Sequence, residues 1–201
     1  MTWIEDIETL DTLYGAASEA ARIKVTDRLI PAYANWIARS RFCLLSSVGP
    51  EGTDCSPRGD DGPVVQAPDP RTLWLPDWRG NNRVDTLRNI VRDGRVSLTF
   101  LIAGSTTAMR VNGTARLSVD PDLLARFARS GAQPRSVIVV AISEVYPQCA
   151  KALLRAGLWR DGDQSDGLAT LGDMLREVTS GGFDGASYDA ELPGRIARTM
   201  W

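Results

Sequence analysis

The spacing of apolar and polar residues along the chain predicts about six β-strands with helices around them. Between residues 106 and 119, Met109, Val111 and Leu117 alternate with polar side chains, which predicts a long strand with one buried face. The remaining strands are predicted at residues 42–48, 53–62, 73–75, 96–100 and 137–145.

Helical spacing of apolar residues predicts helices at both ends of the chain and in two of the connections. Residues 3–40 carry apolar stripes interrupted at Gly15, and Pro31 predicts a kink or a new helix start. These stripes are typical of packing helices. Further helices are predicted at residues 84–91, 121–130 (capped by Asp120), 149–159 (ending at Gly157) and 168–178. The composition of the tail from Gly181 predicts weak order.

The predicted strands are mostly joined by short turns, of which Gly-Pro-Glu-Gly at residues 49–52 is the clearest hairpin signal. This arrangement favours a mainly antiparallel barrel or sandwich, because a doubly wound sheet needs a helix between nearly every pair of strands. A length of 201 residues indicates one domain. We divide it into N-terminal helices (1–40), a barrel (41–146) and a C-terminal helical segment (147–201).

Composition excludes several classes of chemistry. The chain has no histidine, so it has neither Ser-His or Cys-His hydrolysis nor a histidine-ligated zinc site. Three scattered cysteines do not make a disulfide framework, and we predict no metal site. A net charge of −2 argues against nucleic-acid and membrane-surface partners. The N-terminus is acidic and no apolar run approaches the ~20 residues of a membrane span, so we expect a cytoplasmic protein.

The segment 72–100 contains the strongest candidate binding site. A polar turn at residues 77–83 holds Arg79 and Arg83 just before a predicted helix. Free backbone N–H groups at a helix start attract anions, and guanidinium groups bind phosphate oxygens in pairs. The polar strand end at residues 53–62 adds Arg58, and Gly59 there would allow close approach of a ligand. On charge alone, a polar turn with solvated arginines is as consistent with the sequence as an anion-binding site.

Four motifs in this order resemble the pyridoxamine 5′-phosphate oxidase-like family of FMN-binding split barrels, and in particular an uncharacterised bacterial subgroup. The motifs are Ser-Pro-Arg-Gly at 56–59, the segment 73–90, Arg-Val-Asn-Gly-Thr-Ala-Arg-Leu at 110–117 and the segment 149–159. The resemblance implies a six-stranded antiparallel split barrel, mainly β with flanking helices (α+β). It also implies a homodimer with FMN at the subunit interface.

The resemblance and the polar turn together predict the residues that bind the flavin. Arg58 and the pair Asn82-Arg83 resemble the family's phosphate ligands, while Trp159 and Arg160 resemble residues that reach the flavin from the other subunit. The predicted cofactor-binding residues are Arg58, Gly59, Asp77, Trp78, Asn81, Asn82, Arg83, Arg88, Arg110, Trp159 and Arg160.

The chain departs from the true oxidase at two places. The Arg-x-His element near the C-terminus has no counterpart, and Ala108 replaces the glutamine usually found two residues before the position of Arg110. Oxidation of vitamin B6 is therefore not expected. We predict an FMN-dependent oxidoreductase of unknown substrate and unknown catalytic residues. The alternatives are a flavin-binding or storage protein without turnover, and a split barrel for another cofactor such as a deazaflavin; haem is disfavoured because no imidazole is available.

Overall fold

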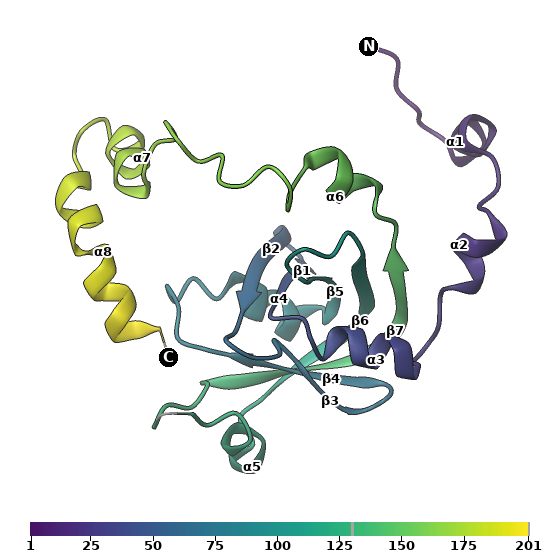
Figure 1. Ribbon diagram of the computed structural model, residues 1–201, viewed down its shortest axis with the longest axis horizontal. Coiled ribbons are helices and arrows are strands. Elements are labelled where there is room, and N and C mark those ends of the chain that lie inside the picture. The colour runs from purple at the N-terminus through teal and green to yellow at the C-terminus, as the bar shows by residue number, and fades with distance from the viewer. Residues whose placement is uncertain (130, 201) are drawn as a thin grey trace.

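The computed structural model describes residues 1–129 and 131–200, and a curled antiparallel sheet occupies its centre (Figure 1). Its seven strands run in the order β2-β1-β5-β6-β7-β4-β3, with every neighbouring pair antiparallel. They are β1 (Phe42–Gly49), β2 (Gly52–Gly59), β3 (Gln66–Asp69), β4 (Thr72–Asp77), β5 (Arg95–Leu101), β6 (Ala108–Ser118) and β7 (Ser136–Gln148). The predicted class, a mainly β antiparallel fold with flanking helices, is confirmed.

Helices flank the sheet and form both ends of the chain. They are α1 (Ile7–Tyr14), α2 (Glu19–Ile23), α3 (Pro31–Ile37), α4 (Asp85–Arg92), α5 (Pro121–Ala125), α6 (Lys151–Ala156), α7 (Leu171–Val178) and α8 (Gly185–Thr199). Pro31 opens α3, as predicted, because its missing N–H needs no partner at the first helical position. The Asp120 carboxylate caps α5. The predicted end of that helix at Ser130, and the final residue Trp201, lie outside the described residues.

The core lies inside the curl of the sheet. Alternate side chains of β1, such as Cys43 and Leu45, are fully buried, and β5 contributes Leu98 and Phe100 in the same way. An ion pair joins Arg58 on β2 to Asp77 on β4, although these strands lie near opposite ends of the strand order. The two edges of the sheet therefore approach each other, as in a barrel that is split along one side.

Two elements differ from the prediction. The short strand β3 was not predicted because all four of its residues are exposed and their side chains show no alternation. The tail from Gly181 is not weakly ordered, as the composition suggested, but forms the fifteen-residue helix α8. Packing explains this correction: α7 crosses α8 so closely that a Cβ on Gly172 would lie 2.2 Å from the Gly185 carbonyl oxygen. Such tertiary contact outweighs the poor helix propensity of Gly185 and Pro193.

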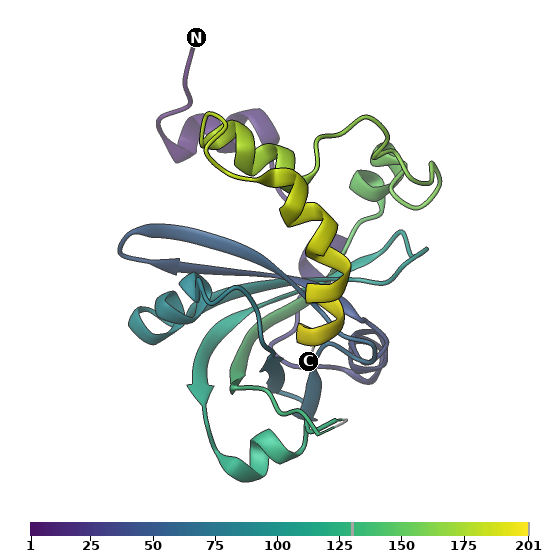
Figure 2. The same cartoon turned by 90° about the vertical axis from the view of Figure 1, so that its left-hand side faces the viewer.

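The two ends of the chain extend away from the barrel on opposite sides (Figure 1). Residues 1–25, with α1 and α2, leave the barrel next to β7, while α7 and α8 pack on each other on the far side. Figure 2 shows α8 running down toward the barrel from above. No helix within residues 1–129 and 131–200 combines the length and the apolar character that crossing a membrane requires.

Candidate functional site

Arg58 and Asp77 form the centre of the candidate site, at the split side of the barrel. Arg58 Nη1 donates to Asp77 Oδ1 at 2.5 Å, and the two side chains are only 21% and 13% exposed. Arg58 lies opposite the buried Cys43 in the β1–β2 ladder, so its side chain starts from the inner face of the sheet. The Arg58 Nε is buried, and among the described residues it has no hydrogen-bond partner.

The turn between β4 and α4 brings a bare helix start to the same place. Asn82 and Val84 both adopt left-handed backbone conformations, with φ of 60° and 53°, which is costly for a β-branched residue such as Val84. Val84 is also the N-cap residue of α4 and gives the helix no side-chain cap. The Asn82 Oδ1 accepts a hydrogen bond from Arg135 Nη1 at 2.9 Å, which fixes the turn against the start of β7. The first backbone N–H groups of α4 are thus left for another acceptor.

Two adjoining pockets surround Arg58. One, of about 160 Å³, is lined by Arg58, Asp77, Trp78, Gly80, Asn81, Asn82, Val84, Leu87, Arg135 and Ser136. The other, of about 260 Å³, is lined by Pro57, Arg58, Gly59, Asp60, Val64, Leu75, Pro76, Trp78, Arg79, Gly80 and Met200. Six predicted cofactor residues therefore lie together: Arg58, Gly59, Asp77, Trp78, Asn81 and Asn82.

Trp78 forms an aromatic wall shared by both pockets. Its indole N–H donates to Asp60 Oδ2 at 3.1 Å, and the Arg129 guanidinium lies 5.3 Å from the ring centre. Arg129 also pairs with Asp60 at 2.7 Å. The ring is consequently fixed by polar partners at its edge and a cation on its face.

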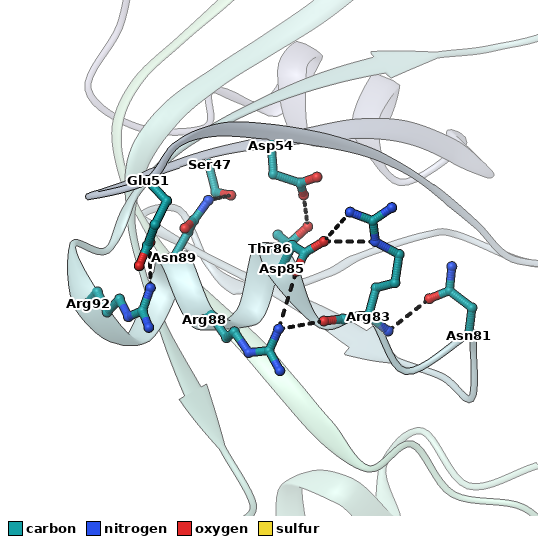
Figure 3. A network of polar contacts seen from close by, with 10 residues as sticks. All are labelled: Ser47, Glu51, Asp54, Asn81, Arg83, Asp85, Thr86, Arg88, Asn89 and Arg92. Carbon is teal, nitrogen blue, oxygen red and sulfur yellow. Dashed lines mark hydrogen bonds and ion pairs between the residues drawn. The ribbon is translucent and has the colours of Figure 1, made fainter. Parts of the chain in front are cut away.

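Arg83, just before α4, and Arg88, on α4, both point toward Asp85 at the start of that helix (Figure 3). Both bind Asp85: Arg83 Nη2 at 2.8 Å and Arg88 Nη1 at 3.3 Å. They line a separate polar pocket of about 440 Å³ together with Arg92, which pairs with Glu51 at 2.5 Å. The structure therefore does not bring Arg83 and Arg88 into the pockets around Arg58. The Arg83 side chain is 79% exposed.

Three further predicted residues lie elsewhere in the single chain. The Arg110 guanidinium lies 5.3 Å from the centre of the Tyr146 ring. Trp159 donates its indole N–H to the Ser105 carbonyl at 2.7 Å. Arg160 pairs with its neighbour Asp161. None of these three lines either pocket around Arg58.

Sequence reasoning missed Arg135. It precedes β7, and the register that places Asp77 opposite Ser136 brings it to the turn at 77–83. Its backbone N–H also donates to the Asp77 carbonyl at 3.1 Å. The only signal in the sequence is a lone arginine just before a strong strand, and such a residue does not reveal the partner strand.

Charge in the two pockets favours an anion. Asp77 neutralises Arg58, but Arg79 has no acidic partner in the part of the chain that the structure describes, and the Arg135 guanidinium binds only the neutral Asn82 amide there. These guanidinium groups and the uncapped start of α4 provide donors of the kind that phosphate accepts. The unpartnered Arg58 Nε supplies one more, because an unsatisfied buried donor costs about 1–3 kcal/mol. A phosphate monoester, such as the tail of FMN, therefore fits this donor set.

The cysteines lie outside these two pockets. Burial raises the pKa of the Cys43 thiol to about 12, so it stays protonated and inert. The pKa of the exposed Cys149 is lowered, first by the Lys151 backbone N–H and then by the Gln148 side chain and the charges of Lys151 and Lys24. Within the described residues, no group of histidine, cysteine and acidic side chains could hold a metal ion.

Comparison with known proteins identifies the family. The profile of the pyridoxamine 5′-phosphate oxidase family matches residues 29–149, more than half of the chain. The chain belongs to the pyridoxamine 5′-phosphate oxidase family. No curated protein matches it.

The chain is also similar to solved structures. HupZ of group A Streptococcus superposes with a TM-score of 0.50 at 13% identity, over 60% of this chain and 95% of HupZ, which shows the fold. A candidate pyridoxamine 5′-phosphate oxidase from Lactobacillus delbrueckii is 24% identical over 60% of this chain and 95% of its own, with a TM-score of 0.48. An FMN-binding protein from Syntrophomonas wolfei is 16% identical over 57% and 78%, with a TM-score of 0.41. The family profile ends before α6, so Trp159 and Arg160 lie outside the matched segment.

Proposed function

We propose that this protein is an FMN-dependent oxidoreductase that holds the flavin phosphate between Arg58 and the start of α4. The observation that carries this proposal is the buried Arg58 Nε, which has no acceptor among the described residues although Arg58 lines both pockets. A phosphate oxygen would satisfy that donor. Membership of the pyridoxamine 5′-phosphate oxidase family supports a flavin as the molecule that carries this phosphate.

The residues around Arg58 would each have a distinct part in holding the cofactor. Asp77 keeps the Arg58 guanidinium in place, Gly59 offers backbone without a side chain, and Trp78 supplies an aromatic wall. Asn81 and Asn82 shape the turn, with Asn81 Oδ1 accepting from the Arg83 backbone N–H at 3.0 Å. When bound, FMN would supply the electron transfer, and these side chains would bind and orient it.

Arg83 is proposed as a second phosphate ligand, supported by Arg88. Its side chain is exposed and pairs with Asp85 in this structure, and we propose that it exchanges that carboxylate for a phosphate oxygen when FMN binds. A surface ion pair of this kind contributes little to stability, so little opposes its exchange.

A homodimer completes the proposal. Arg110, Trp159 and Arg160 do not line the pockets around Arg58 in their own chain. We propose that Trp159 and Arg160 contact the flavin bound to the other subunit, and that Arg110 is a further polar contact. Light scattering of the purified protein measures the oligomeric state directly, and a monomer at micromolar concentration would contradict this part.

Riboflavin lacks the phosphate and so tests the site most directly. We expect FMN to bind at least tenfold more tightly than riboflavin, since each charge-assisted hydrogen bond contributes roughly 1.5–3 kcal/mol. The measurement is quenching of flavin fluorescence during titration of the protein. Arg83→Ala should weaken FMN binding by one to a few decades, at about 1.4 kcal/mol each, and leave riboflavin binding unchanged. Arg92→Ala is the matched control, because Arg92 lies at the far end of α4, the helix that follows Arg83, and pairs with Glu51. Equal affinity for FMN and riboflavin would contradict the phosphate site.

Turnover is tested separately. Anaerobic mixing of the FMN-loaded protein with NADH or NADPH should bleach the flavin absorbance if the protein is an oxidoreductase. Uniformly slow bleaching with every reductant would instead identify a flavin carrier.

A further inference from the structure

The N-terminal arm, residues 1–25, carries an apolar stripe that nothing in its own chain covers. Trp3, Ile7, Leu10, Leu13 and Tyr14 are each at least 37% exposed, and α1 has no buried residue. A free helix of eight residues is marginal in water, and its stability normally comes from packing its apolar face. We therefore expect the arm to bury its apolar stripe against another surface.

The arm is also acidic. Residues 1–14 include Glu5, Asp6, Glu8 and Asp11 and no lysine or arginine. Asp6 caps α1, so its carboxylate is occupied, whereas Asp11 follows Ile7 by one turn and borders the apolar stripe. The docking surface for such a helix should be apolar with cations at its rim.

One groove of this chain has that character. It measures about 770 Å³ and is lined by Arg39, Arg41, Phe42, Leu44, Leu101, Ile102, Ala103, Leu158 and Trp159. Phe42, Leu158 and Trp159 are more than a third exposed. The guanidinium groups of Arg39 and Arg41 have no hydrogen-bond or ion-pair partner among the residues that the structure describes. Unpaired guanidinium groups beside an apolar floor complement the acidic, apolar helix in both respects.

We infer that the N-terminal arm of a second copy of this chain occupies the groove. The arm cannot be resting on its own groove in the arrangement seen, because α1 stands well away from β1 and β5 (Figure 1). Its root is fixed there: Thr26 and Val145 exchange two backbone hydrogen bonds, at 3.1 and 2.8 Å. A symmetric pair of chains would insert both arms in the same way, as a closed two-fold dimer does.

This inference rests on the proposed function only for the existence of a dimer, and it adds what the arm does there. Residues 1–28 lie outside the family match, so the arm is a feature of this chain rather than of the matched barrel. The partner's arm would pack against Trp159, the residue proposed to reach the other subunit's flavin.

Disulfide trapping between different chains tests the inference. In a Cys55→Ser, Cys149→Ser background, one tagged chain carries Leu10→Cys and an untagged chain carries Leu158→Cys. Co-expressed and mildly oxidised, they should give a linked pair in the tagged fraction. The matched control moves the second cysteine to Val119, which is more exposed than Leu158 (70% against 48%) but lies outside the groove. The inference is overturned if the pair forms no more often than with Val119→Cys, or if a link forms only when both cysteines share one chain.

Charge reversal provides a second test. Arg39→Glu with Arg41→Glu in the untagged chain should reduce the yield of the linked pair roughly tenfold, since like charges at an interface are strongly disfavoured. Adding Glu8→Arg and Asp11→Arg to the tagged chain should restore it. If the yield of the linked pair is unchanged after the first reversal, or does not recover after the second, the arm does not occupy the groove.

FMN titration of the same variants separates this inference from the proposed function. If Leu10→Cys and Leu158→Cys give no more linked pair than the Val119→Cys control while FMN affinity and dimer mass are normal, the arm alone is overturned. Normal trapping without any FMN binding overturns the proposed function alone.

Discussion

Arg58→Ala is expected to lower the free energy of unfolding by about 2–3 kcal/mol. Removing one partner of a fully buried ion pair costs about 3–5 kcal/mol, because the remaining charge is left without compensation. The side chains of Arg58 and Asp77 are 21% and 13% exposed, so water recovers part of that loss. The pair also joins β2 to β4 across the split of the barrel, where no backbone ladder connects these strands.

Urea unfolding of the flavin-free protein, followed by tryptophan fluorescence, measures this loss. The midpoint should fall while the dependence of the free energy on urea concentration stays constant. Arg95→Ala is the matched control: Arg95 pairs with Asp93 at a similar 2.6 Å, but the side chains are 70% and 26% exposed. That variant should unfold at the wild-type midpoint, since exposed pairs contribute little.

A double-mutant cycle isolates the pair itself. Arg58→Ala combined with Asp77→Ala should be less destabilising than the sum of the two single changes, with a coupling of about 1–3 kcal/mol. Additive single changes would refute the reasoning, because they would mean that the two side chains act independently at the split. So would an Arg58→Ala midpoint equal to that of Arg95→Ala.

Three further predictions concern packing and the thiols. Gly113→Ala should destabilise the protein by about 1–3 kcal/mol in the same urea assay, because its Cβ would lie 2.1 Å from the Ala141 carbonyl oxygen; Gly62→Ala, with nothing within 4 Å, is the control and should match wild type. Stability should fall as the pH rises from about 9 toward 12, because the pKa of the Cys43 thiol is raised to about 12 in the folded state and the unfolded thiol ionises first. Cys43→Val should remove that part of the fall, and an identical pH profile in the variant would contradict the assignment. Iodoacetamide at pH 7.5 should alkylate Cys149 faster in the folded protein than in urea, because its pKa is lowered when folded, as mass spectrometry of the peptides can show; slower labelling in the folded protein would argue the opposite.

Local signals in the sequence were sufficient for most of the fold. The hairpin at residues 49–52, the alternation in β6 and the helix start at Pro31 each follow from side chains close together in the chain. Strand β3 has no such signal, because its exposed residues are held by backbone pairing with β4. Helix α8 depends on tertiary contacts, including the close crossing at Gly172 and the Arg195 guanidinium 3.9 Å from the centre of the Tyr188 ring.

The candidate site shows the same limit. Arg58 and Asp77 were both predicted to belong to it, but their ion pair was not, because the partnership depends on how far the sheet curls. The separate location of Arg83 and the approach of Arg135 likewise depend on the left-handed turn before α4. Residue types thus indicate an anion site, whereas its geometry is set by strands that are distant in sequence.

The Arg58–Asp77 ion pair has two opposing effects on the affinity for the proposed cofactor. Asp77 cancels the charge of Arg58 and so weakens its long-range attraction for a phosphate. It also fixes the guanidinium in one orientation, so less side-chain entropy is lost when an anion binds. Net attraction must then come from Arg79, Arg135, the uncapped start of α4 and the proposed ligand Arg83, whose fields are screened beyond roughly 10 Å, in a chain of net charge −2. Such a site would select a ligand that already fits the cleft, rather than concentrate anions from solution.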